Sequence, residues 1–147
     1  MSAMPDDSVT KELIEKAFDM LNFSYTPYSN YRVGAALLTA TGKIYTGCNI
    51  ENIAFGPSNC AERTAFFKAV SEGEKEFAAI AIVGGPCGNV TDYCTPCGVC
   101  RQVMREFCQD DFKIIMAKSV SDYKNMTLKE LLPESFSPQG EVGASQN

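Results

Sequence analysis

Two short motifs that contain cysteine constrain the fold of this chain more than any other feature. In the first, Cys60 is followed two residues later by Glu62. In the second, Pro96 is followed directly by Cys97 and then, three residues later, by Cys100. Both motifs stand where the pattern predicts the start of a helix, and there unpaired N–H groups and the helix dipole favour a thiolate. Cys97 and Cys100 are three residues apart and share one helical face. The spacing therefore predicts that Cys97 and Cys100 can converge on one metal ion.

The rest of the pattern predicts helices alternating with strands. The first helix is expected to be capped by Ser8 or Thr10. In chain order we expect a helix to about Leu21, strands over 31–39 and 43–50, a helix over 60–71, a strand over 77–83, a helix from 97 or 98 to 107, a strand over 112–117 and a short closing helix over 126–132. This order predicts an α/β fold, a three-layer α-β-α sandwich with helices on both sides of a sheet.

The length of 147 residues, with no linker-like stretch before the last dozen positions, predicts a single domain over residues 1–147. About 1–7 and 138–147 are expected to be flexible tails. Thirteen Lys and Arg against 18 Asp and Glu give a net charge of −5 with no basic block, so a small neutral substrate is favoured and a nucleic acid partner is disfavoured. No signal peptide or membrane-spanning stretch is found, so we expect a cytoplasmic protein with no membrane partner.

The chain has seven cysteines and no histidine. An odd count without a secretory signal argues against a disulfide framework, and metal ligands must be Cys, Asp or Glu. Cys60, Cys97 and Cys100 would give a tetrahedral Zn²⁺ three ligands and leave the fourth position for water, as in catalytic zinc sites. Glu62 is then the candidate general base for that water. Arg63 can offset the negative charge of three thiolates through hydrogen bonds.

Four segments resemble cytidine deaminases of the small homotetrameric type. They are 27–37, 47–52, 60–65 and 96–102. The zinc deaminase pattern H-x-E followed by P-C-x-x-C, with Cys in place of His, is matched at every defined position. The resemblance covers most of the chain and implies a mixed central sheet, one Zn²⁺ per subunit and a homotetramer. It also implies hydrolysis of cytidine and 2′-deoxycytidine to uridine and 2′-deoxyuridine with release of ammonia, in pyrimidine salvage.

The same resemblance implies contacts to the nucleoside. Asn49 and Glu51 would hold the ribose 3′-hydroxyl, because an amide and a carboxylate offer a donor and acceptors. Tyr31 would pack against the pyrimidine, at a position where the family usually has Phe.

Further contacts follow from the same likeness. The backbone N–H of Ala61 and the carbonyl of Thr95 would bind the O2 atom of the base and its leaving amine. Glu62 would take the proton of the attacking water, pass it to N3 and then help to protonate the departing amine. Phe55 and Phe136 stand where aromatics of neighbouring subunits complete each pocket in the family.

Other interpretations remain open from the residues alone. A structural zinc module would use Cys94 with Cys97 and Cys100, completed by Cys87 or Cys48, but it leaves the Glu and Arg after the first cysteine without a role. A thioredoxin-like protein would form a reversible Cys97–Cys100 disulfide and hold no metal. A deaminase of nucleotides or single-stranded nucleic acid would need a positive groove and stacking residues, which the charge and the absence of Trp disfavour.

Overall fold

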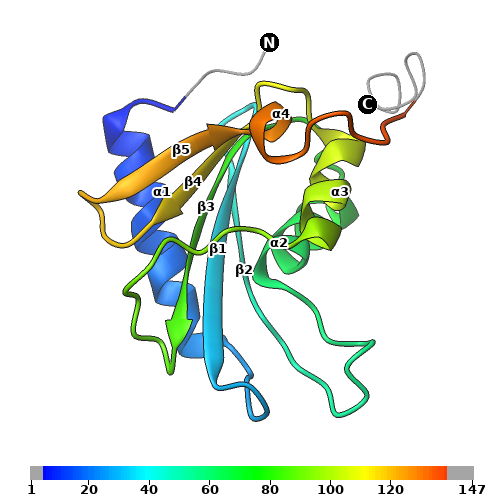
Figure 1. Cartoon of the computed structure of the whole chain (residues 1–147). Coiled ribbons are helices and arrows are strands. Elements are labelled where there is room, and N and C mark those ends of the chain that lie inside the picture. The colour runs from blue at the N-terminus through cyan, green and yellow to red at the C-terminus, as the bar shows by residue number, and fades with distance from the viewer. Residues whose placement is uncertain (1–4, 139–147) are drawn as a thin grey trace.

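A mixed five-stranded sheet forms the centre of the computed structural model, which describes residues 5–138 (Figure 1). The elements in chain order are α1 (Asp7–Met20), the 3₁₀ helix η1 (Leu21–Phe23), β1 (Tyr31–Thr39), β2 (Ile44–Cys48), α2 (Ala61–Ser71), β3 (Phe77–Pro86), α3 (Gly98–Phe107), β4 (Lys113–Ala117), β5 (Tyr123–Thr127) and α4 (Leu128–Leu131). The strand order is β2-β1-β3-β4-β5. Only the β3–β4 pair is parallel within the described sheet, and the other neighbours are antiparallel.

The helices cover both faces of this sheet, as Figure 1 shows with α1 on one side and α2 and α3 on the other. Successive residues of β3 alternate between the two faces, so Ala79 and Ala81 pack in the same core as α1. Ile80 and Ile82 pack on the opposite face, in the core that contains Phe66 of α2. The predicted three-layer sandwich is confirmed, with one hydrophobic core on each face of the sheet.

One glycine allows α2 to start close to the sheet. A Cβ atom at Gly47 in β2 would lie 2.4 Å from the carbonyl oxygen of Ala61 and 2.6 Å from the backbone nitrogen of Ala65. Such contacts are far inside van der Waals distance, so any larger residue would displace the first turn of α2. That turn follows Cys60, and the close approach therefore positions a predicted metal ligand.

Three expectations about the elements were wrong in detail. The cap of α1 is Asp6, whose side chain accepts from the Val9 N–H at 2.9 Å, and neither Ser8 nor Thr10 has that role. The predicted closing helix over 126–132 is shorter, because residues up to Thr127 belong to β5. Strand β3 extends to Pro86, beyond the predicted end at Val83.

The helix α1 begins within the stretch 1–7 for which a flexible tail was predicted. Residues 1–4 and 139–147, which make up most of the two predicted tails, lie outside the described residues. Over 5–138, none of the helices combines the length and the hydropathy needed to traverse a bilayer.

Candidate metal centre and substrate pocket

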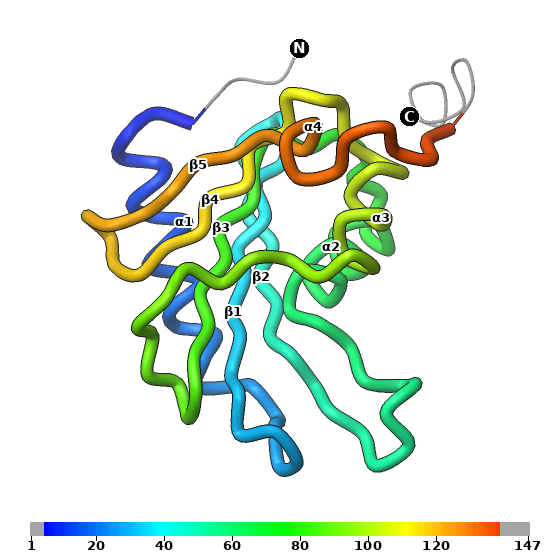
Figure 2. Tube along the Cα trace, in the orientation of Figure 1, coloured from blue at the N-terminus to red at the C-terminus, as the bar shows by residue number. Residues whose placement is uncertain are grey.

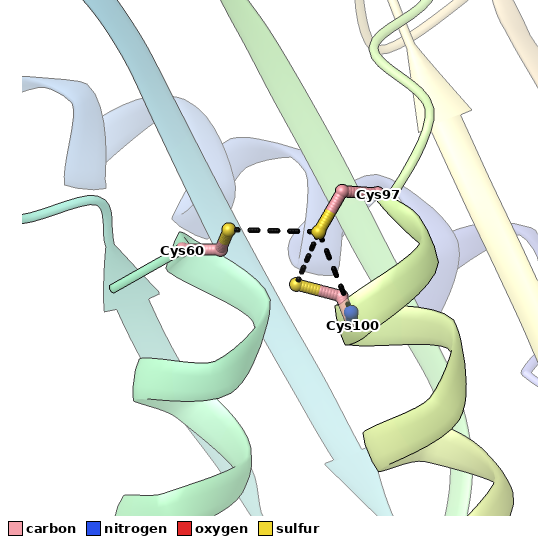
Figure 3. Close-up of side chains that lie close together, drawn as sticks. All are labelled: Cys60, Cys97 and Cys100. Atoms are coloured by element: carbon pink, nitrogen blue, oxygen red, sulfur yellow. Dashed lines mark hydrogen bonds between the residues drawn. The ribbon is translucent and has the colours of Figure 1, made fainter. Parts of the chain in front are cut away.

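The three predicted cysteine ligands meet between the N-termini of α2 and α3 (Figure 3). The Sγ atoms of Cys60 and Cys97 are 3.8 Å apart, and those of Cys97 and Cys100 are 3.5 Å apart. Two thiolates bound to Zn²⁺ at about 2.3 Å on tetrahedral bearings lie about 3.8 Å from each other. The spacing of the sulfur atoms therefore fits one zinc ion.

Each half of this sulfur cluster is held at a helix terminus. Cys60 and Cys97 are the N-cap residues of α2 and α3, both with extended backbone, and the Cys97 sulfur accepts from the Cys100 N–H at 3.4 Å. The chain after β3 passes in front of β1 and β2 in the view of Figure 2 before it enters α3. This path brings Cys97 and Cys100 to the start of α2, although 37 residues separate Cys60 from Cys97.

Ionisation of the thiols is coupled across the cluster. The hydrogen bond from the Cys100 thiol, and then the Arg63 guanidinium, lower the pKa of Cys60 to about 5. Arg63 donates from Nη2 to the Cys60 sulfur at 3.3 Å. The pKa of Cys100 is raised, because its proton is held by Cys60 and because its thiol is buried. A divalent metal bound to all three sulfur atoms would compensate the charge of the further thiolates.

Glu62 is a buried carboxyl group beside this cluster. Its side chain is only 4% exposed, and burial raises its pKa to about 7, with a further increase from the neighbouring Cys60 thiolate. A carboxyl group that titrates near neutral pH can both accept and return a proton. The residue type, its burial and its position are those of a general acid and base.

A cavity of about 680 Å³ opens beside the sulfur cluster of Cys60, Cys97 and Cys100. Ten of the predicted site residues line it: Tyr31, Asn49, Glu51, Phe55, Cys60, Ala61, Glu62, Arg63, Thr95 and Cys97. Cys100 is 1% exposed and is not among the residues that line the cavity. Phe136 does not line the cavity in this chain; its side chain is 84% exposed, and its carbonyl accepts from Gln102 Nε2 at 2.7 Å.

Asn49 and Glu51 are held in place by the chain around the start of β1. The Asn49 side chain accepts from the Val33 N–H at 2.9 Å and donates to the Tyr31 carbonyl at 2.8 Å. Glu51 accepts from the backbone N–H groups of Tyr28 and Ser29 at 3.0 and 3.1 Å. Both side chains therefore enter the cavity with defined orientations.

The loop after β3 contributes residues that the sequence did not single out as pocket residues. Tyr93 and Cys94 line the cavity. The Tyr93 hydroxyl donates to Asp122 at 2.6 Å, and the Lys118 ammonium lies 4.6 Å from the centre of its ring. Burial raises the pKa of Cys94 to about 12, so this side chain is a neutral thiol. The available signal was their position, directly before Thr95.

Cys94 is not part of the metal cluster. Within residues 5–138, the group of cysteine and acidic side chains able to share one metal ion consists of Cys60, Cys97 and Cys100. This grouping leaves the fourth coordination position to a small molecule, unlike the four-cysteine alternative.

Fold and site together define a class: an α/β protein with an open three-thiolate metal centre and a buried carboxyl group at the end of a pocket. Comparison with known proteins narrows this class. Residues 7–116 match the family model described as the cytidine and deoxycytidylate deaminase zinc-binding region. The chain belongs to this family, as its sequence motifs predicted.

Individual relatives resemble the chain over nearly its whole length. It is 46% identical over 129 residues to a cytidine deaminase of Sporosarcina psychrophila, covering 88% of this chain and 92% of the relative. It is 42% identical over 144 residues to a probable cytidine deaminase of Dictyostelium discoideum, covering 94% and 93%. The crystal structure of the cytidine deaminase from Burkholderia pseudomallei superposes with a TM-score of 0.78 at 43% identity, covering 85% of this chain and 97% of that chain.

Proposed function

We propose that this protein is a zinc-dependent cytidine deaminase that hydrolyses cytidine and 2′-deoxycytidine to the corresponding uridines and ammonia. The observation that carries the proposal is the placement of Glu62 beside an open three-cysteine metal cluster at the end of a nucleoside-sized cavity. The named relatives are cytidine deaminases over most of this chain, which supports the same substrate here and a place in pyrimidine salvage.

Cys60, Cys97 and Cys100 would hold the zinc ion. When bound, zinc supplies Lewis acidity that lowers the pKa of a water molecule at its open coordination position. Glu62 would take a proton from a water molecule as the water oxygen bonds to C4, and would pass this proton to N3 of the ring. Glu62 would then take the second proton from the oxygen now bound to C4 and pass it to the amine, so that the C4–N4 bond breaks, the C4 carbonyl forms and ammonia leaves. Arg63, through its hydrogen bond to the Cys60 sulfur, offsets part of the thiolate charge.

The other pocket residues would hold the nucleoside in register with this carboxyl group. Tyr31 packs against the pyrimidine ring, and Asn49 and Glu51 take the 3′-hydroxyl of the sugar. The Ala61 N–H and the Thr95 carbonyl bind O2 and the leaving amine. All five residues line the same cavity. Backbone donors and acceptors suit this task because they require no side-chain ordering on binding.

We assign the active form to a homotetramer with one zinc ion per subunit. Phe55 is 74% exposed and lies at the cavity rim, while Phe136 is 84% exposed. Exposed aromatic side chains of this size are favoured at protein interfaces, where they could complete the pocket of a neighbouring subunit. The thiol ligands require a reducing compartment, which supports the cytoplasm as the location.

A direct assay tests the proposal. Zinc-loaded protein should change the ultraviolet spectrum of cytidine, and a chelator should abolish this change. Glu62→Gln keeps the shape of the side chain and the sulfur ligands, so it should retain zinc and lose turnover by about 10²- to 10⁴-fold. An unchanged cytidine spectrum with zinc-loaded protein would refute the proposal, and cytidine monophosphate and a cytosine-containing oligonucleotide distinguish the substrate classes.

A further inference from the structure

The carboxylate of Glu51 is held by a turn that lies far from it in the sequence. The backbone N–H groups of Tyr28 and Ser29 both donate to Oε1, at 3.0 and 3.1 Å. The Ser29 hydroxyl donates to the other oxygen, Oε2. Three donors from two consecutive residues therefore fix one carboxylate whose own position is more than 20 residues away.

The Ser29 hydroxyl has its own direction fixed by β1. Its oxygen accepts from the Tyr31 N–H at 3.0 Å. A serine hydroxyl has one proton and two acceptor lone pairs. Because the backbone N–H of Tyr31 approaches one lone pair, the single proton is available for Glu51. Ser29 thus links the residue that would bind the sugar to the backbone of the residue that would pack on the base.

Asn49 closes the same network from the other side. Its amide joins the Tyr31 carbonyl and the Val33 N–H, at 2.8 and 2.9 Å. The backbone of Tyr31 is therefore held at its N–H by Ser29 and at its carbonyl by Asn49. This arrangement couples the predicted sugar contacts to the start of β1 through hydrogen bonds.

A count of acceptor sites identifies the atom left for a ligand. An ionised carboxylate has about four lone-pair positions, two on each oxygen. The two backbone donors occupy Oε1, and the Ser29 hydroxyl occupies one position of Oε2. The remaining acceptor position lies on Oε2, the oxygen that Ser29 orients. Hydrogen bonds to an ionised carboxylate are shorter and stronger than those between neutral groups.

We propose that Ser29 is a positioning residue, which orients Oε2 of Glu51 toward the 3′-hydroxyl of the substrate and so sets the recognition of the sugar. This inference rests on the sugar-binding role assigned to Glu51 under the proposed function. Ser29 acts through Glu51 and takes no part in the chemistry at C4. Without the Ser29 hydroxyl, the carboxylate keeps its charge and its two backbone donors on Oε1, but Oε2 loses the hydrogen bond that holds it, and water competes for the free position.

The test compares cytidine with 3′-deoxycytidine in zinc-loaded protein. Ser29→Ala should lower kcat/KM for cytidine about 10-fold, mainly through KM, because a charge-assisted hydrogen bond to the substrate is weakened. For 3′-deoxycytidine, which lacks the hydroxyl, the loss should be less than about twofold. Ser29→Thr keeps a hydroxyl and should restore most of the activity toward cytidine. Ser71→Ala, at the end of α2, is the matched control and should behave as the parent protein, since its hydroxyl contacts only the Lys68 carbonyl among its described hydrogen bonds.

Glu51→Gln separates the two levels of the argument. Suppose that Glu51→Gln lowers kcat/KM for cytidine more than for 3′-deoxycytidine, while Ser29→Ala lowers kcat/KM for both nucleosides equally or for neither. The positioning role of Ser29 is then wrong, and the role of Glu51 stands. If Glu51→Gln also changes kcat/KM for the two nucleosides equally, the sugar contact of Glu51 is wrong, and so is the inference for Ser29. The double variant Ser29→Ala with Glu51→Gln should lose little more kcat/KM for cytidine than Glu51→Gln alone. Both changes weaken the same contact, that of Glu51 with the 3′-hydroxyl.

Discussion

Replacement of Arg63 by Gln should weaken zinc binding without removing a ligand. The guanidinium donates to the Cys60 sulfur at 3.3 Å and helps to lower the pKa of that thiol. Three thiolates and Zn²⁺ have a formal charge of −1, so loss of the adjacent positive charge leaves this excess less compensated. A hydrogen bond to a charged group contributes about 1.5–3 kcal/mol. With about 1.4 kcal/mol for each tenfold change, the zinc dissociation constant should rise by about 10- to 100-fold.

Competition with a chromophoric chelator measures this constant directly. The matched control is Lys68→Gln, which removes a positive charge from the same helix but contacts the Thr46 carbonyl and not the sulfur atoms. Its zinc affinity should stay within about twofold, because an exposed charge away from the ligands is screened by water and salt. The reasoning is refuted if Arg63→Gln binds zinc as tightly as the parent protein, or if both variants lose affinity equally.

Two further predictions concern the elements around the site. Gly47→Ala should lower the free energy of unfolding by about 1–3 kcal/mol through overpacking and reduce bound zinc, because its Cβ would lie 2.4 Å from the Ala61 carbonyl oxygen. Thermal unfolding and metal analysis check this. The control is Gly98→Ala, whose Cβ has no neighbour within 4 Å. Cys94 should resist alkylation at pH 8, because burial raises its pKa to about 12, whereas the exposed Cys87 reacts first; peptide mass spectrometry of the zinc-loaded protein reports the order, and earlier modification of Cys94 would contradict it.

The sequence was sufficient for the metal cluster because its signals are local. Cys60 with Glu62, and Cys97 with Cys100, combine a fixed spacing with a predicted helix start, and the structure brings the sulfurs together at these starts. The strand β5 was missed for a physical reason. Residues 123–127 form a partly exposed edge strand of mainly polar composition, and the helical pattern after Thr127 obscured its end.

Contacts between distant segments were not predictable from spacing. The hydrogen bond between Ser29 and Glu51 joins residues 22 positions apart, and neither residue reveals its partner by periodicity. Tyr93 lies in a stretch without a repeating apolar pattern, and its packing depends on Asp122 and Lys118 of the β4–β5 connection. Such tertiary hydrogen bonds depend on the detailed fold. Composition and local propensity predict only the class of fold, and therefore not these contacts.

The site consists of two parts that are held by different forces. The sulfur ligands are positioned by the packing of α2 and α3 on one face of the sheet, where Phe66 and Met104 belong to a common core. Asn49 and Glu51 are positioned by hydrogen bonds to residues 28–33, on a partly solvated rim. Changes confined to the rim should therefore alter KM and leave the zinc content intact, whereas changes in the core beneath the helices should reduce both. A Ser29→Ala protein that lost its zinc would contradict this division, because no hydrogen bond described for Ser29 reaches the sulfur cluster.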